Sequence, residues 1–175
     1  MKFLSVVAGV FALSAGLAAQ GPPAKGSSGK SAIGVTLGSL GCSTPLGSDA
    51  FEVLSWSWGA SNPVDLIGGG GGGAGKVSVS DLSVMKPFDA CSPALLGAVA
   101  TGKAFPSLTL AASNKDGTTT TVTLSDVRVS SWQASGSAAS AAAVESASFV
   151  FSKFCLVDGS SGARFCYDLK LGKTF

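Results

Sequence analysis

The sequence has no histidine and few charged residues of either sign. Of its 175 residues, 12 are lysine or arginine and 10 are aspartate or glutamate, together 13% of the chain. Without an imidazole, a serine or cysteine nucleophile has no ordinary general base, and a zinc site has few ligands available. A net charge of +2 gives no electrostatic basis for binding nucleic acid or an anionic membrane. These absences argue against triad hydrolases, zinc proteins and nucleic-acid-binding proteins.

No other pattern supplies a site for chemistry. The sequence lacks a G-x-S-x-G elbow and a C-x-x-C pair, and its two glutamates, Glu52 and Glu145, stand in separate segments. Asp158 and Asp168 flank a predicted hairpin, where solvated turn and strand-end roles are usual. We therefore predict no catalytic, cofactor-binding or metal-binding residue, with an exported carboxylate-pair hydrolase left open as an alternative.

The most conspicuous motif is a run of six glycines, residues 68–73, followed closely by Gly75 and Lys76. From Gly70 onward the spacing matches a phosphate-binding G-x-x-x-x-G-K-[ST] loop, except that Val77 takes the last position. Valine cannot bind magnesium, and the residues that follow alternate like a strand, so no helix N-terminus would face a phosphate. We interpret the run as a connection between strands, with Lys76 as a solvated strand-end charge.

The N-terminus has the pattern of a secretory signal peptide. Lys2 supplies a positive start, residues 3–17 form an uncharged apolar run, and small residues follow at Ala18 and Ala19. We predict cleavage after Ala18 or Ala19. An uncleaved membrane anchor is the alternative, although the run is shorter than the roughly 18 apolar residues that a span needs.

This prediction divides the chain into a signal peptide at residues 1–19, a flexible Pro/Gly/Ser-rich linker at 20–31 and one folded domain at 32–175. After cleavage no membrane segment remains. We therefore expect a secreted, extracellular protein, with the periplasm as the other location. Export also permits disulfide bonds.

Short β-type runs dominate the sequence from residue 32 onward. Residues 33–40 and 51–58 are the first two predicted strands. In the second, Leu54, Trp56 and Trp58 alternate on one face. We interpret this face as core, and the alternative is a carbohydrate-stacking pair of tryptophans.

Three later runs change the parity of their apolar residues part-way along. The changes fall between Val79 and Leu82, between Leu124 and Val127, and between Phe151 and Phe154. Such a change needs a bulge, or a strand that passes from one buried face to another. Repeated bulges favour a closed barrel over a flat sheet, and burial of both strand faces is the alternative.

One helix is predicted in the segment 91–103. Ser92 is its predicted cap, Pro93 takes the first helical position, and Gly102 marks the stop. Its predicted apolar face consists of Leu95, Leu96 and Val99. The alanine- and serine-rich segment 135–144 lacks a stripe of large apolar residues, so we predict an extended loop there.

Four segments, taken in order, carry a resemblance to a known family. They are FEVLSWSWGASNP (51–63), GAGKVSVSDLSVMKPFDACSPALLGAVATGK (73–103), TVTLSDVRVSSWQ (121–133) and ESASFVFSKFCL (145–156). With them the chain resembles the Hcp (haemolysin-coregulated protein) tube family of type VI secretion systems, from roughly Phe51 to Lys170. The first strand region, residues 32–46, is similar only loosely.

The resemblance implies a compact β-barrel of two sheets with one flanking α-helix, so we expect a mainly β fold. It also implies a non-catalytic structural protein without cofactors, which assembles as hexameric rings stacked into a tube. Its partners would be further copies of this chain, together with secretion effectors or a spike protein. Family members that build the injected tube carry no cleaved signal peptide, so a secreted monomeric Hcp-like binding module is the alternative.

The four cysteines suggest two disulfides. Cys155 and Cys166 lie in two β-type runs around a strong Asp-Gly-Ser-Ser-Gly turn signal, and a hairpin centred between Ser160 and Ser161 sets the cysteines directly opposite one another. Opposed residues have Cβ atoms about 4.5–5.5 Å apart, close to the spacing of a disulfide. We predict a Cys155–Cys166 bridge, which leaves Cys42 and Cys91 to pair without a register argument. Four free thiols are the alternative.

Overall fold

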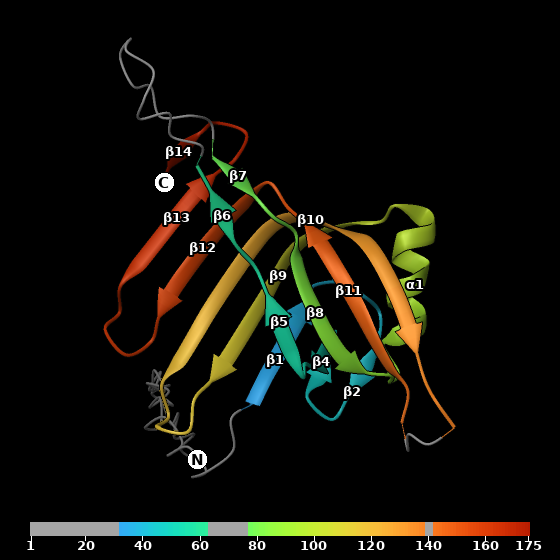
Figure 1. The fold of residues 1–175 in the computed structure, drawn as a ribbon. Coiled ribbons are helices and arrows are strands. Elements are labelled where there is room, and N and C mark those ends of the chain that lie inside the picture. Colours follow the sequence, from blue (N-terminus) through green and yellow to red (C-terminus); the bar gives the residue numbers. More distant parts are fainter. Residues whose placement is uncertain (1–31, 63–76, 139–141) are drawn as a thin grey trace, which may run out of the picture.

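A computed structural model describes residues 32–62, 77–138 and 142–175 of the chain (Figure 1). These residues form one α-helix, α1 (Ser92–Thr101), and fourteen strands, which confirms the mainly β fold. The strands are β1 (Ala32–Leu37), β2 (Ser43–Thr44), β3 (Gly47–Ser48), β4 (Ala50–Glu52), β5 (Ser55–Ser57), β6 (Ala60–Ser61), β7 (Ser78–Val79), β8 (Leu82–Pro87), β9 (Ala104–Ser113), β10 (Thr119–Ser135), β11 (Val144–Val150), β12 (Lys153–Asp158), β13 (Arg164–Asp168) and β14 (Lys173–Thr174). The predicted signal peptide, linker and glycine run lie outside the described residues.

The long strand β10 organises the fold. One of its edges pairs with β9, while its other edge pairs first with β12 and then with β11. From β9 the sheet continues to β1 and β4, and from β11 it continues to β8 and β5. Two short ribbons, β2–β3 and β6–β7, stand apart from this ten-stranded sheet.

The sheet closes through the residues between β4 and β5. The N–H of Val53 donates to the carbonyl of Ile33 at 2.9 Å, and the N–H of Leu54 donates to the carbonyl of Met85 at 2.7 Å. These bonds tie the two ends of the sheet to one another. The result is the expected barrel, with α1 on its flank (Figure 1).

Two of the three parity changes, those in the segments 121–129 and 148–156, have a common physical origin. Asp126 in β10, whose φ is 55°, takes the register position opposite Pro106 in β9 and opposite Ser152, which lies in the break between β11 and β12. β10 keeps the same register with β9 on both sides of Asp126, and its register with β12 continues unchanged into its register with β11. We call the row of Pro106, Asp126 and Ser152 across the three strand paths the fold line. Beyond it β10 exchanges β12 for β11, which is how the strand passes between two buried faces.

Two further irregularities complete the path of the barrel. A bulge shifts the register of β10 against β11 between Val129 and Ser131. The parity change between Val79 and Leu82 is a break between two strands, because β7 pairs with β6 whereas β8 pairs with β5 and β11. The expected barrel is thus present, but the expectation of bulges at the parity changes is wrong at two of the three positions, because Val79/Leu82 and Phe151/Phe154 fall between separate strands and the bulge lies at Val129/Ser131.

The core lies inside the barrel and under the helix. Its largest apolar side chains include Phe51, Phe105, Phe149 and Leu95, all at most 2% exposed. The predicted face of residues 51–58 is wrong for Leu54, which is 51% exposed, because the run is interrupted between β4 and β5. Phe51 and Val53 point inward instead. Trp56 and Trp58 are half-buried and pack against the core, as predicted.

The helix begins differently from the prediction. Its N-cap is Cys91, which makes no side-chain cap, and the Ser92 hydroxyl accepts the N–H of Asp89 at 2.9 Å. Leu96 is 47% exposed, whereas Ala98 is buried. Gly102 ends the helix in the left-handed conformation, with φ of 64°, as the stop signal predicts.

Two remaining expectations concern loops and membranes. Residues 136–138 and 142–143 are not helical, in agreement with the predicted loop, and residues 139–141 lie outside the described part. Among the described residues no helix is long and apolar enough to span a membrane.

Candidate assembly surfaces

A buried ion pair holds one end of the barrel. Lys86 Nζ lies 2.7 Å from Glu145 Oε1 and 2.9 Å from Asp89 Oδ1, and it donates to the Pro87 carbonyl at 2.8 Å. Both members of the Lys86–Glu145 pair have fully buried side chains. Trp132 Nε1–H donates to the other Glu145 oxygen at 3.0 Å. Every donor of the lysine has an acceptor, so the buried charges are compensated and have a structural role.

The sequence analysis did not predict this ion pair, although the positions of both residues in their strands indicated that they face the core. Lys86 shares the parity of Leu82 and Val84, and Glu145 shares that of Ala147 and Phe149. Both charges therefore fall on buried strand faces. Glu52, by contrast, is exposed. The two glutamates are not brought together, and the structure offers no carboxylate pair for hydrolysis at these positions.

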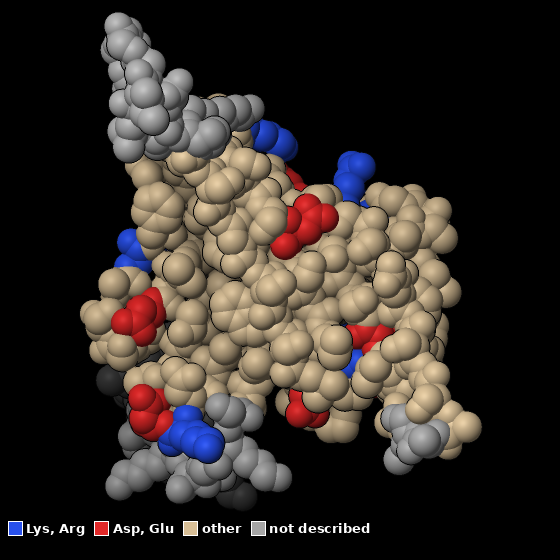
Figure 2. All heavy atoms as spheres, in the orientation of Figure 1, with Lys and Arg blue, Asp and Glu red and all other residues tan. Residues whose placement is uncertain are grey.

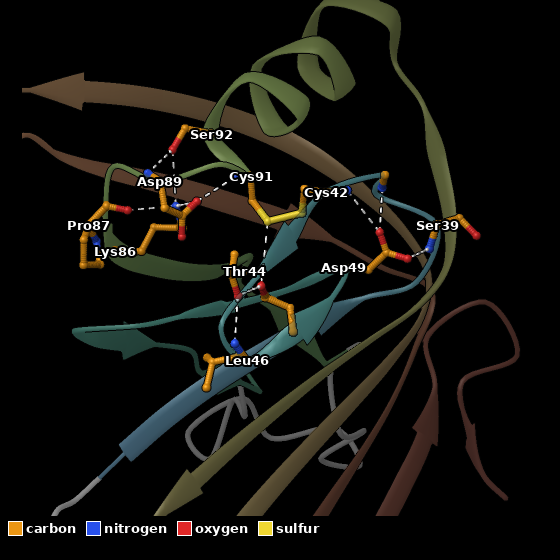
Figure 3. The surroundings of a disulfide bond; sticks show 12 residues. Ser39, Cys42, Thr44, Leu46, Asp49, Lys86, Pro87, Asp89, Cys91 and Ser92 are labelled. Carbon is orange, nitrogen blue, oxygen red and sulfur yellow. Dashed lines mark hydrogen bonds and ion pairs between the residues drawn. A yellow bond between two sulfur atoms is a disulfide. The ribbon is translucent and has the colours of Figure 1, made fainter.

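A disulfide between Cys42 and Cys91 adjoins the ion pair (Figure 3). The Cys91 N–H donates to Asp89 Oδ1 at 2.8 Å, so Asp89 links the disulfide to Lys86. On the other side of the bond, Asp49 holds the loop that carries Cys42. The Gly41 N–H, at 2.6 Å, is the largest cause of a lowered pKa of the Asp49 carboxyl, and the amides of Cys42 and Ser39 add to it.

The second disulfide joins Cys155 to Cys166, which face each other in the β12–β13 pairing. This confirms the register predicted for the hairpin. Its turn is held by Asp158, whose pKa is lowered to about 2, chiefly by the hydroxyl of Ser161 and then by that of Ser160. The turn role expected for Asp158 is thus correct.

The solvated role expected for Asp168 is wrong. The residue is only 4% exposed, and it accepts the N–H groups of Lys170 and Leu171 at 2.9 Å each. The Leu171 N–H is the largest cause of its lowered pKa. Lys153 Nζ lies 3.2 Å from its other oxygen. Strand β13 leads straight into this tight turn, which buries the carboxylate against backbone amides.

One face of the hairpin is apolar and only partly covered. Phe154 is buried, but its neighbours on the same face, Leu156 and Phe165, are 38% and 51% exposed. Leu156 and Phe165 are directly opposed across the two strands, and the Phe165 ring stacks on Tyr167 with centroids 6.3 Å apart. We call Leu156 and Phe165 the hairpin surface; the adjacent Arg164 lies on the opposite face, where its Nε donates to Cys166 Sγ.

The outer face of β5, β8 and β11 is uncharged and rich in serine. Its outward residues are Ser55, Ser57, Ser83, Met85, Ser146 and Ser148. Shallow hollows of about 200 and 110 Å³ lie on either side of Met85, which is 45% exposed. In Figure 2 this face is mostly free of charged side chains, which lie mainly toward its margins.

A hollow of about 600 Å³, open to solvent, follows the fold line. It is lined by Ala104, Phe105, Pro106, Asp126, Arg128, Val150, Phe151, Ser152 and Lys170. Asp126 accepts the Ser152 hydroxyl at 2.5 Å, the largest cause of its lowered pKa, and Lys170 lies 3.4 Å away. In this hollow the Asp126 carboxylate therefore contacts both the Ser152 hydroxyl and the Lys170 ammonium. Within the described ranges no cluster of three metal-binding side chains occurs.

Known proteins with a similar sequence or fold come from type VI secretion systems. Residues 41–156 match the model of the family "Type VI secretion system effector, Hcp". No curated protein matches the chain. Among solved structures, a type six secretion system protein has a TM-score of 0.72 at 24% identity, covering 83% of this chain and all of its own.

Two further structures are named for an Hcp protein and for a type VI secretion system effector. Hcp1 from Salmonella typhimurium has a TM-score of 0.67 at 25% identity, covering 83% of this chain and 99% of its own. A type VI secretion system effector from Yersinia pestis has a TM-score of 0.62 at 21% identity, covering 78% and 98%. Because the family model matches more than half of the chain and the fold agrees, this chain belongs to the Hcp family of type VI secretion system proteins and is a structural protein, not an enzyme.

Proposed function

We propose that this chain is a tube-type subunit whose copies assemble into rings of six that stack end to end. The observation that carries the proposal is the family match over residues 41–156. The surface is consistent with self-assembly, because few charges are available to repel neighbouring copies. Small secretion effectors inside the ring, and a spike protein at its end, are the further partners we propose.

The mature subunit is exported. Its signal pattern at residues 1–19 supports this, and so do two disulfides, since such bonds persist in oxidising compartments. Residues 20–31 then form a linker ahead of one domain at 32–175. The extracellular space is its proposed location.

The same signal pattern favours a second candidate function. A subunit sent through the general secretory route leaves the cytoplasm, where the injected tube of this family assembles. Such a chain would act as a secreted monomeric binding module that kept the barrel and lost the ring.

Size measurement of the exported protein separates the two candidates. Sedimentation velocity at micromolar concentration should give one species of six copies for the ring. A species of monomer mass at every concentration would reject the ring and favour the binding module. Mass-spectrometric sequencing of the same sample should find an N-terminus at Ala19 or Gln20, and full-length protein confined to the cytoplasm would contradict export.

A further inference from the structure

We propose that the Cys155–Cys166 disulfide is a thiol-exchange site, where a small external thiol becomes attached to Cys155 and Cys166 leaves as a thiolate. The two cysteines face each other across β12 and β13, yet their surroundings differ. Of the two, it is Cys166 that contacts a cation, the guanidinium of Arg164. The inference needs the export proposed above, which permits the bond, but it does not need the ring.

Access decides which sulfur of the bond is attacked. In thiol–disulfide exchange a thiolate attacks one sulfur while the other departs, so the more accessible sulfur is the target. Cys155 is half-buried, whereas Cys166 is only 4% exposed. Beside Cys155 on the neighbouring strand β10 stands Thr123, an uncharged residue that does not repel an approaching thiolate. Cys155 is therefore the sulfur that an external thiol reaches.

A cation beside Cys166 makes this cysteine the better leaving group. Arg164 Nε donates to Cys166 Sγ at 3.0 Å, and in the described part of the chain this guanidinium has no carboxylate partner. Lys153 and Lys173, which share this face, both stand opposite the carboxylate of Asp168. A neighbouring cation lowers the pKa of a cysteine thiol, and a thiol of lower pKa departs faster. Arg164 thus favours the same direction of bond opening as access does.

The Cys42–Cys91 disulfide has different surroundings. Cys91 is fully buried, and its Sγ lies 3.7 Å from the carbonyl oxygen of Ala50, which disfavours a thiolate there. On the other side of the bond, the carboxylate of Asp49 accepts the Cys42 N–H at 3.4 Å. The charge of Lys86, near this bond, is already bound by two carboxylates (Figure 3). Exchange should therefore be confined to the hairpin bond.

The exchange balances in two steps. The external thiolate forms a bond to Cys155 Sγ as the bond to Cys166 breaks, and Cys166 keeps the electron pair as a thiolate. A second external thiol then displaces the first from Cys155, so the two external sulfurs end as a disulfide and the protein gains two electrons. The hairpin outlasts both steps, because Asp158 still accepts the hydroxyls of Ser160 and Ser161, and β12 still pairs with β10.

Reaction with β-mercaptoethanol, a small uncharged thiol, tests the proposal on protein recovered from the medium. The reaction is stopped early with acid, the free thiols are alkylated, and the peptides are mapped without reduction. We expect the β-mercaptoethanol adduct on Cys155, an alkylated Cys166 and an intact Cys42–Cys91 bond. The melting temperature before the reaction shows that each sample is folded.

Substitutions at Arg164 separate the effect of its charge from that of its packing. Arg164→Leu should slow the first exchange step roughly three- to tenfold, because the departing thiolate loses its cation. Arg164→Lys keeps the charge and should recover most of the rate. The matched control is Arg128→Leu, which removes an exposed arginine beyond the fold line and should leave the rate unchanged.

The opposite outcomes overturn the proposal. They are an adduct mainly on Cys166, equal rates in the unmodified protein and in Arg164→Leu, faster opening of the Cys42–Cys91 bond, and free thiols at Cys155 and Cys166 before the reagent is added. Neither the mass in solution nor the N-terminus of the protein enters these results, so a failed ring or a failed export is seen separately. If Arg164→Leu does not fold, the position of the adduct in the unmodified protein decides.

Discussion

The end of the barrel at Cys42–Cys91 and the β12–β13 hairpin are both closed by a disulfide, yet they are built in opposite ways. The first bond joins residues 49 apart in the sequence, beside a fully buried ion pair. The second joins directly opposed residues 11 apart, next to an exposed phenylalanine. The barrel end turns its polar groups inward and satisfies them there. The hairpin leaves Leu156 and Phe165 exposed with respect to the described part of the chain.

The largest expected effect is at the buried ion pair. Lys86→Met leaves Glu145 charged and buried without its partner, and we expect it to lower the free energy of unfolding by about 3–5 kcal/mol. Lys170→Met is the matched control, because the Lys170–Asp126 pair is exposed, and it should change stability far less. Urea denaturation followed by tryptophan fluorescence measures both. Equal losses in the two variants would show that burial of the first pair has no special energetic weight.

The two disulfides should differ in a graded way. Replacing Cys42 and Cys91 with alanine opens the longer loop, and chain-entropy arguments give a loss of about 4 kcal/mol, against about 3 kcal/mol for Cys155 and Cys166. Denaturation of both double variants tests this order. A larger loss for the hairpin pair would contradict it. Non-reducing peptide mapping of exported protein should recover both bonds, and alkylated Cys155 and Cys166 would count against the hairpin bond.

A smaller effect is expected in the hairpin turn at Gly159. A Cβ there would fall on the carbonyl oxygen of Thr119, which is backbone and cannot swing aside. Gly159→Ala should therefore lower the free energy of unfolding by about 1–3 kcal/mol. The control is Gly97→Ala in α1, where the Cβ meets nothing within 4 Å and should stabilise the protein by about 0.5–1 kcal/mol. Thermal melting of both variants should therefore show shifts of opposite sign.

The smallest expected effect depends on pH. Asp158 has a pKa of about 2 in the folded protein against 3.8 in the unfolded chain, so its ionised form stabilises the hairpin turn above about pH 4. That contribution is lost as the pH falls from about 4 to about 2. The melting temperature of the Asp158→Asn variant should therefore fall less between about pH 4 and about pH 2 than that of the unmodified protein. An identical loss would assign the acid sensitivity to other carboxyl groups.

The sequence predicted the features that depend on nearby residues, and it did not predict those that depend on contacts between distant segments. The register of Cys155 against Cys166 depends only on the turn between them, and it was correct. The helix stop at Gly102 is local in the same way. Cys42 and Cys91 could be paired only by elimination, because their approach depends on barrel closure through Val53 and Leu54. That closure also interrupts the strand in which Leu54 was expected to face the core.

The buried charges show a different limit. Lys86 and Glu145 stand on core-facing positions, but sequence rules place lysine and glutamate at the surface unless a partner is known. The partner lies 59 residues away on a neighbouring strand. Asp168 was misjudged for a related reason, since backbone amides of the following turn, rather than water, solvate its carboxylate. Polar satisfaction by distant or backbone groups is not visible in a local pattern.

The Cys42–Cys91 bond also governs what proteolysis can do to this protein. A single cut at any peptide bond between these cysteines, including one within the glycine run at residues 68–73, leaves two pieces that remain covalently joined. The pieces then stay at a high effective concentration relative to one another. A protease can therefore cut this stretch of the chain without releasing either part of the barrel.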